Sequence, residues 1–464
     1  MPTLRADLKR SLSTRLARLR AGGFAPAVGL LVSGTAIGHA ITAVAMPVLT
    51  RLYTPDDFGL FAVFSAALAI VAVAACLRYE IAIPIPQAED TAANLLAVAV
   101  CAAVLVSAIS ALVVLPAGAI VAGWIGQPRL EGYLWLLPLA ILLSGVYAAQ
   151  QYWLLRHKQF ALLARTRISQ SAAASGSQLA LGATGASAFG LLTGPVVNLA
   201  AGCLRVAPHL FRQRQRLLPA IGAARMWQAA RSHANFPLFS TAEALANSAA
   251  IQLPVMLIAA LASSAEAGQL MLAMYVVQAP MALLGNAVGQ VYLTRAAEAW
   301  RVGQLGALTT SVVGGLLRTG VGPLLFLGLT APFLFGPLFG ADWTRAGTIV
   351  AWLTPWFVMQ FLASPVSMAL HVAARQRLAM LLQLAGLALR SGAVLLAHHL
   401  FGAYLTEAYA LSGLLFYLAG LLATAAVANC EAAQFRAAIA GAALPIGIWA
   451  GAGVVVAALA QWWQ

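Results

Sequence analysis

Charged residues are scarce in this chain of 464 residues, at 9% of the sequence, whereas soluble globular domains carry about one quarter. Cysteine is also rare. None of the four cysteines forms a CxxC pair, which argues against a disulfide framework or a cysteine-based metal centre. The patterns HExxH, GxSxG and the P-loop are missing as well. These absences predict a protein that is not an enzyme and that holds no metal and no cofactor.

Apolar residues make up 62% of the chain and form stretches long enough to cross a bilayer, which takes about 20 residues per helix. The fold class that we expect is an all-α polytopic membrane protein with 12–13 transmembrane helices. The predicted spans lie near 26–50, 59–78, 92–116, 133–154, 168–186, 188–209, 235–261, 268–292, 319–338, 346–371, 378–400, 404–428 and 437–460.

The basic residues follow a topological rule. Of the 27 lysines and arginines, 22 fall in the N-terminal tail or in every second loop, three (Arg51, Arg129, Arg345) fall in the opposite loops, and Arg318 and Arg390 fall at or inside spans. Because positive residues stay on the cytoplasmic side of a membrane, the N-terminus is predicted to be cytoplasmic. The net charge of +14 favours anionic membrane lipids as neighbours, and its scatter over many loops argues against nucleic acid as a partner.

The sequence divides into five predicted parts: a basic tail (1–25), an N-terminal lobe of six spans (26–209), a polar connection (210–234), a C-terminal lobe of six spans (235–428) and an additional helix (429–464). The two lobes have similar short sequences at equivalent positions. The first hairpin turns at Asp57-Phe58-Gly59 in one and at Glu266-Ala267-Gly268 in the other. The loop after the fourth span (156–161) also resembles the loop after the tenth (374–379). Together the two matches indicate an internal duplication, with both lobes in one orientation, related by a pseudo-twofold axis, around a central cavity.

Two arginines are the most unusual polar residues of the spans. Arg390 lies thirteen residues beyond Arg377, which places it about 20 Å into the membrane. An arginine at that depth costs roughly 3 kcal/mol, so it is expected to face protein or a water-filled cavity. A structural ion pair or snorkelling would also explain it, and Arg318, at the start of a span, could simply reach the interface.

Other polar residues line helix faces. Ser240, Glu243 and Asn247 share one face of a span, and Glu243 is a candidate proton or cation site, or a partner for Arg390. His39 lies on a second polar face and could carry a proton. Hydrogen bonding between helices is the simpler explanation for such faces. Arg78 and Glu80 either form a local ion pair or line the inner mouth of a cavity.

One segment resembles a known family. The run from Pro47 to Phe61, PVLTRLYTPDDFGLF, and the later run from Leu77 to Pro84, LRYEIAIP, are similar to those of Wzx-type flippases. The segment from Phe335 to Trp343 also resembles the family's sequence before its tenth span. These proteins form the polysaccharide-transporter family of the multidrug/oligosaccharidyl-lipid/polysaccharide (MOP) exporter superfamily. The likeness extends over about residues 25–430, and the thirteenth span departs from the common twelve.

The resemblance implies two six-helix lobes that work by alternating access in the bacterial inner membrane. Its substrate would be an undecaprenyl-pyrophosphate-linked oligosaccharide of O-antigen, capsule or exopolysaccharide, and a polysaccharide polymerase and chain-length proteins would be further partners. Arginine suits a pyrophosphate, so Arg390, helped by Arg78 or Arg318, is the expected anion site. Asn247 would line the lumen, and His39, Glu243 and Glu80 would line it or couple an ion.

Three alternatives remain at this point. A multidrug or small-metabolite antiporter of the same superfamily would favour carboxylates over arginines in the lumen. An integral-membrane glycan polymerase or ligase would need a large outside loop with essential polar residues, and the predicted outside loops are short. A purely structural partner of a polysaccharide-export complex is the third.

Overall fold

The computed structural model describes residues 24–373 and 375–463, and every regular element in these ranges is helical. The helices have the following bounds: α2 (Phe24–Leu52), α3 (Pro55–Ala72), α4 (Tyr79–Ala82), α5 (Glu89–Trp124), η1 (Pro128–Tyr133), α6 (Leu136–Arg156), α7 (Phe160–Ala183), α8 (Ser187–Ala220), α9 (Ala223–Ser232), η2 (Phe236–Ser240), α10 (Thr241–Leu261), α11 (Ser264–Arg301), α12 (Leu305–Leu316), η3 (Leu317–Val321), α13 (Gly322–Phe339), η4 (Ala341–Trp343), α14 (Thr344–Val366), α15 (Ala369–Val372), α16 (Gln376–Phe401), α17 (Leu405–Val427), α18 (Ala432–Ala440) and α19 (Ala443–Trp463).

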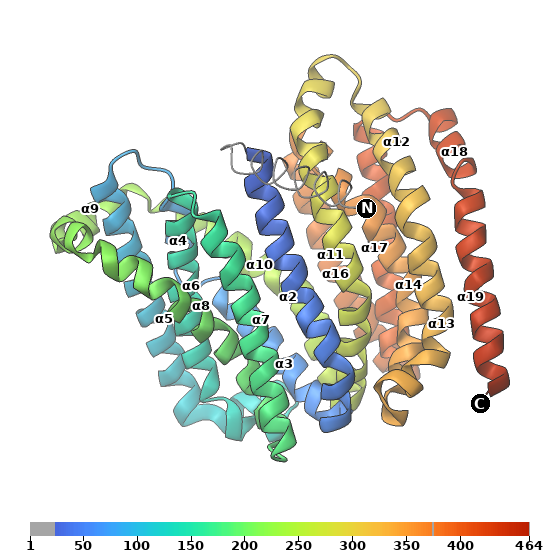
Figure 1. Cartoon of the computed structure of the whole chain (residues 1–464), viewed down its shortest axis with the longest axis horizontal. Helices are drawn as coiled ribbons and strands as arrows, with labels where there is room; N and C mark the ends of the chain where they lie inside the picture. Colours follow the sequence, from blue (N-terminus) through green and yellow to red (C-terminus); the bar gives the residue numbers. More distant parts are fainter. Residues whose placement is uncertain (1–23, 374, 464) are drawn as a thin grey trace, which may run out of the picture.

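The long helices run up and down through the molecule, as expected for a membrane protein (Figure 1). Within the described residues, ten segments are long and apolar enough to cross a bilayer. The predicted fold class, an all-α multi-pass membrane protein, is confirmed. The predicted basic tail lies outside the described residues except for its last two positions, where α2 begins.

Several helices extend well beyond the predicted spans. Helix α8 continues to Ala220, through the first part of the arginine-rich segment 210–234 that was expected to be a polar connection, and α9 follows it almost at once. Helix α11 likewise continues to Arg301. Hydropathy marks only the part of a helix that lies in the hydrocarbon. The adjoining turns are rich in alanine, leucine and arginine, which favour helix in water too.

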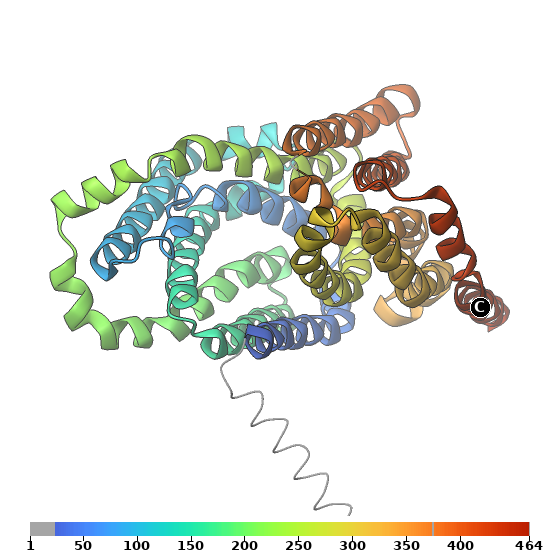
Figure 2. The ribbon, with the colours of Figure 1, turned by 90° about the horizontal axis from the view of Figure 1, so that it is seen from above.

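The N-terminal half (α2–α8) and the C-terminal half (α10–α17) lie side by side, with α2, α3, α10 and α11 between their outer helices (Figures 1 and 2). Helix α9 closes one edge of the N-terminal half. We call the end of the molecule that carries the Thr54 and Ser263 turns the hairpin face, and the end at which α2 begins the tail face.

The same local chemistry starts α3 and α11 at the hairpin face. Thr54 caps α3 in a reciprocal pair with Asp57, and Pro55 occupies the first helical position, where a missing N–H costs nothing. Ser263 caps α11 by accepting a hydrogen bond from the backbone N–H of Glu266, at 3.0 Å. Each half therefore begins its second long helix with a hydroxyl cap and an acidic residue in the first turn.

A pair of glycines brings the two halves into backbone contact. A Cβ on Gly59 would overlap the carbonyl oxygen of Ser264, and a Cβ on Gly268 would overlap that of Pro55. The contact is reciprocal, since each glycine meets the first residue of the other helix. The two turns that resemble each other in sequence are thus in direct contact.

Two further contacts close the hairpin face. The indole of Trp343 donates to the backbone oxygen of Thr50, at 2.8 Å, and packs edge-on against Phe58, with ring centroids 4.8 Å apart. Gln127 donates to the backbone oxygen of Ala259, at 2.7 Å. Each contact joins an N-terminal element to a C-terminal one, so the halves are closed against each other at this face.

Each half also has a charged cluster at the hairpin face. In the C-terminal half, Arg345 binds Glu266 at 2.8 Å and Glu407 at 2.6 Å, and Thr406 donates to Glu266 at 2.7 Å. In the N-terminal half, Asp57 accepts from Ser187 at 3.1 Å and lies 3.8 Å from Arg129. These pairs give a structural role to Arg129 and Arg345, two of the arginines that break the charge rule.

Helix α19 lies at the outer edge of the C-terminal half (Figure 1) and packs against α13. Trp449 covers Gly322 and stacks edge-on against Phe326, with ring centroids 5.7 Å apart. Only 6% of the helix's most apolar stretch is buried within the molecule. The thirteenth helix is therefore attached to a complete C-terminal half instead of being part of its core.

Candidate functional site

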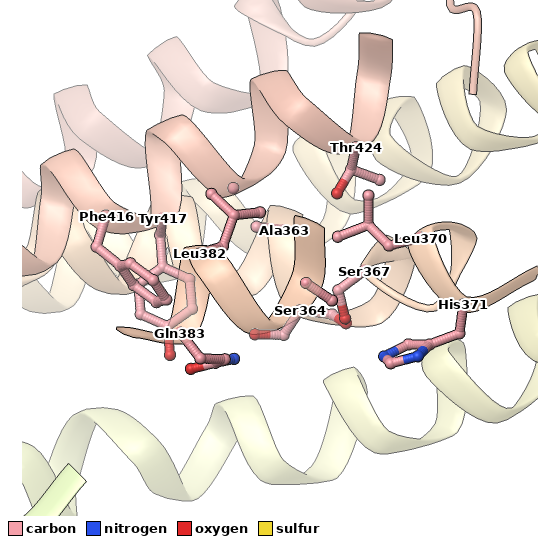
Figure 3. Close-up of a pocket in the computed structure, with 12 residues that line it drawn as sticks. Ala363, Ser364, Ser367, Leu370, His371, Leu382, Gln383, Phe416, Tyr417 and Thr424 are labelled. Carbon is pink, nitrogen blue, oxygen red and sulfur yellow. The ribbon is translucent and has the colours of Figure 1, made fainter. Parts of the chain in front are cut away.

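A pocket of ≈ 190 Å³ lies between α14, α15, α16 and α17, towards the tail face of the C-terminal half. Figure 3 shows the side chains of Ser364, Ser367, His371 and Gln383 pointing towards one open space. Its polar lining consists of Ser364, Ser367, His371, Gln383, Tyr417 and Thr424.

Helical spacing explains this lining. Ser364, Ser367 and His371 follow one another at three and four residues, so they share one face across the end of α14 and the start of α15. The Ser367 hydroxyl is already engaged, since it donates to the backbone oxygen of Ser364 at 2.8 Å. His371 is exposed at the edge of the pocket. The site therefore offers hydroxyls, an amide and one imidazole, with no carboxylate in its lining.

Arg390 lies on α16, two turns beyond Gln383, and is only 4% exposed. Its Nε donates to the backbone oxygen of Gly386, at 3.1 Å. Its guanidinium lies over the ring of Phe416, 4.8 Å from the centroid, and Phe416 also lines the pocket. The side chain of Phe416 thus contacts Arg390 and also lines the pocket.

The groups around Arg390 compensate its positive charge only weakly. Within the described residues, no carboxylate lies within 4 Å of its guanidinium, so the predicted partner Glu243 does not pair with it in this conformation. A cation–π contact is worth about 0.5–2 kcal/mol, less than the roughly 3 kcal/mol that an arginine costs in the middle of a membrane. The site therefore retains capacity for an anion.

Arg78 and Glu80 form a second polar site near the tail face. Their side chains are 3.6 Å apart, and Arg78 has a left-handed backbone, with φ of 62°. Burial raises the pKa of Glu80 above its ordinary value, and the effect of Arg78 is smaller and opposite. Arg78 Nε and Glu80 Oε2 are both enclosed without a hydrogen-bond partner. The ion pair is thus incomplete, and two buried polar atoms remain available to water or a ligand.

The other predicted site residues lie apart from these two. Arg318 is exposed in the π-helical turn η3, and its guanidinium approaches Gly441 at the end of α18. Glu243 and Asn247 are exposed on α10, and His39 is half-buried on α2.

Of the seven predicted site residues, the structure joins only Arg78 and Glu80 by a contact between described side chains. The helical spacing of Ser364, Ser367 and His371 can be read from the sequence, whereas Gln383, Tyr417 and Thr424 were missed. A usable signal existed, because Gln383 and Arg390 are seven residues apart, as are Tyr417 and Thr424, and such spacing places both members of a pair on one helix face.

Two helical halves, closed against each other at one face and carrying polar pockets, form a multi-pass membrane bundle, and solved structures share this fold. Lipid II flippase MurJ, in an inward closed conformation, matches with a TM-score of 0.68 and 10% identity, over 94% of this chain and 96% of that one. A multidrug resistance MATE family transporter of the MOP superfamily, in an outward-facing conformation, matches with a TM-score of 0.53 and 13% identity, over 90% and 98%. A MOP superfamily transporter from Pyrococcus furiosus matches with a TM-score of 0.53 and 14% identity, over 89% and 98%. The chain therefore has the fold of these MOP superfamily proteins.

Residues 48–346 match the family described as polysaccharide biosynthesis protein. Because this match covers more than half of the sequence, the chain belongs to that family. The resemblance noted from the Pro47–Phe61 run is confirmed at the level of family and fold. No curated protein matches the sequence.

Proposed function

We propose that this protein is a flippase. It moves an undecaprenyl-pyrophosphate-linked oligosaccharide from the cytoplasmic to the periplasmic leaflet of a bacterial inner membrane by alternating access. Membership of a polysaccharide biosynthesis family and the fold shared with lipid II flippase MurJ support this proposal. The distribution of basic residues over the loops supports a cytoplasmic N-terminus and a cytoplasmic tail face. The closed hairpin face then lies towards the periplasm.

The observation that carries the proposal is the buried, weakly balanced charge of Arg390. A pyrophosphate is a compact anion, and the planar guanidinium matches its oxygens in pairs. In a membrane interior the attraction is strong, because the local dielectric is low. Phe416 lies against Arg390 and lines the adjacent pocket, so a rotation of this ring would open a short path between them.

The remaining predicted residues have supporting roles in this proposal. Arg78 and Arg318 attract the anionic headgroup at the cytoplasmic side. Asn247 and His39 contact the glycan, and Glu243 and Glu80 bind or release a coupling cation. A polysaccharide polymerase and chain-length proteins would receive the product, whether the pathway makes O-antigen, capsule or exopolysaccharide.

One observation favours a second candidate, a multidrug or small-metabolite antiporter. Glu243 is exposed on α10, and no ion pair holds it within the described part of the chain. An exposed carboxylate in a transporter lumen suits cationic substrates or a proton. The two candidates differ in the sign of the charge that matters, which mutation can separate.

The test compares Arg390→Ala and Arg390→Lys in a deletion strain, with Arg377→Ala as the matched control. Arg377 lies on the same helix and is exposed near its start. We expect the deletion and Arg390→Ala to lose surface glycan and to accumulate lipid-linked intermediate, with partial activity for Arg390→Lys and wild-type activity for Arg377→Ala. Membrane expression is measured for each variant.

A deletion strain with every surface glycan intact would contradict the flippase and favour the antiporter. In that case Glu243→Gln, not Arg390→Ala, should abolish resistance to cationic compounds.

A further inference from the structure

The N-terminal half contains a second pocket, of ≈ 350 Å³, which no predicted site residue lines. It lies among α2, α3, α6, α7 and α8, and α7 supplies the largest share of its polar groups. These polar lining residues are Thr42, Ser144, Ser171, Ser175, Gln178 and Asn198.

The lining has hydroxyls and amides but no charged side chain. Ser171, Ser175 and Gln178 are spaced at four and three residues, so one face of α7 points into the pocket. A polar face of this kind is costly inside a membrane bundle unless it meets hydrogen-bonding partners. Its composition does not suit a pyrophosphate or a cation, and it suits an uncharged molecule with many hydroxyls.

One member of this face lacks a partner. Ser175 is 4% exposed, and its Oγ is enclosed without a hydrogen bond. Gln178 is engaged, since its Nε2 donates to the backbone oxygen of Leu191 at 3.1 Å. An enclosed hydroxyl without a partner costs about 1–3 kcal/mol, and a serine hydroxyl can turn towards the pocket by rotation about a single bond.

Unpaired polar atoms continue beyond Ser144 along α6. Tyr147 is 5% exposed and Gln150 is 8% exposed, and the Tyr147 hydroxyl and the Gln150 Oε1 are enclosed without partners. Tyr147 and Gln170 both approach Gly202, one turn beyond Asn198 on α8. The pocket thus lies at one end of a row of polar side chains inside the N-terminal half. In ordinary packing these positions would hold apolar side chains.

The pocket also lies on the side of the N-terminal half that faces its counterpart. Thr42 on α2 and Phe61 and Leu68 on α3 border it, and α2 and α3 both contact α11 of the C-terminal half. A molecule held between the two halves could therefore place one end in this pocket and the other beside α16.

We propose that this N-terminal pocket is a subsite for uncharged sugar residues of the transported lipid. The inference rests on the proposed flippase function and divides recognition between the halves. The C-terminal half binds the pyrophosphate through Arg390, and the N-terminal half binds sugar hydroxyls through Ser175, Ser171 and Asn198.

The experiment measures binding of two probes to the purified full-length protein in detergent. One probe is undecaprenyl pyrophosphate, which has no sugar, and the other is the undecaprenyl-pyrophosphate-linked oligosaccharide extracted from the source cells. The variants are Ser175→Val, which removes the hydroxyl, and Ser175→Thr, which keeps it. Ser177→Val is the matched control, because Ser177 lies on the same helix outside the pocket lining and donates to the backbone oxygen of Ala174.

We expect Ser175→Val to weaken binding of the oligosaccharide lipid by about tenfold, the effect of one lost hydrogen bond, and to leave binding of undecaprenyl pyrophosphate unchanged. Ser175→Thr should bind the oligosaccharide lipid better than Ser175→Val does, and Ser177→Val should match the wild type with both probes.

Three results would overturn the subsite. The wild type could bind both probes equally, so that sugars add nothing, or Ser175→Val could weaken both probes equally, as a purely structural residue would. Wild-type protein that binds neither probe would overturn the proposed function, and the subsite with it.

Discussion

Three arginines, Arg78, Arg345 and Arg390, differ in the groups that surround their charge. Arg345 lies among two carboxylates and Arg78 lies beside one, whereas Arg390 contacts an aromatic ring and a carbonyl oxygen and forms no ion pair with a described residue. The first two arginines sit at opposite ends of their halves, and Arg390 sits deep within one. In our proposal the buried Arg390 binds the pyrophosphate directly, whereas Arg345 stabilises the hairpin face and Arg78 keeps one nitrogen available near the tail face.

Glycine matters at the residue scale where the two halves touch. We predict that Gly59→Ala destabilises the closed hairpin face, because the new Cβ would overlap the carbonyl oxygen of Ser264 and neither backbone can yield cheaply. Overpacking of this kind typically costs about 1–3 kcal/mol. Thermal unfolding in detergent, followed by tryptophan fluorescence, should show a lower midpoint.

The matched control for this prediction is Gly176→Ala on α7, where a Cβ would meet open space. Alanine favours helix over glycine by about 1 kcal/mol, so this variant should equal or exceed the wild type in stability. Gly268→Ala should repeat the effect of Gly59→Ala, since the contact is reciprocal. A loss in only one of these two variants would contradict the symmetric contact.

At the scale of elements, the sequence predicted which stretches are helical and where most of them turn. Hydropathy located the long helices because apolar length is a physical requirement of the bilayer. It missed the polar ends of α8 and α11, which continue into water, and the separate helix α9. The pockets were harder to foresee, because Ser175 and Gln383 look like ordinary polar residues until the packing of several helices shows which faces meet.

Helix α19 allows a prediction at this scale. We expect a chain that ends after Cys430, and so lacks α18 and α19, to keep most of its transport activity. The reason is that only 6% of the most apolar stretch of α19 is buried within the molecule, and the helix packs mainly on α13. Complementation of the deletion strain and the amount of protein in the membrane are the measurements.

A chain that ends after Ala403 is the control, since it also lacks α17. Helix α17 packs against α14 and α16 and carries Phe416, so this truncation should abolish transport. If the shorter removal also abolishes transport at normal expression, α19 has a role beyond attachment.

The whole molecule consists of two helical halves that contact each other at the hairpin face. The sequence predicted the duplication from two pairs of short segments, and the structure brings one pair, the two turns, into contact through Gly59 and Gly268. The hairpin-face contacts connect the halves through apolar packing and hydrogen bonds, while the charged clusters lie within each half. Such a molecule can separate its halves without breaking the ion pairs that hold each one together.

Separation of the halves can be detected at Ala267. This residue is fully buried in an apolar cluster formed mostly by the N-terminal half, although it belongs to α11. In a chain whose four native cysteines are replaced by serine, we predict that Ala267→Cys is protected from a membrane-impermeant thiol reagent while the hairpin face is closed. Alternating access requires that this cysteine becomes reactive in cells that synthesise the lipid-linked glycan, and that it reacts less in cells blocked before the first sugar is added.

Two further variants are the controls. Ala140→Cys, fully buried among N-terminal helices, should stay unreactive in both strains, and Ala88→Cys, exposed before α5, should react in permeabilised cells of either strain. Equal protection of Ala267→Cys in both strains would mean that the halves do not part at this face, and the transport path would then have to open elsewhere.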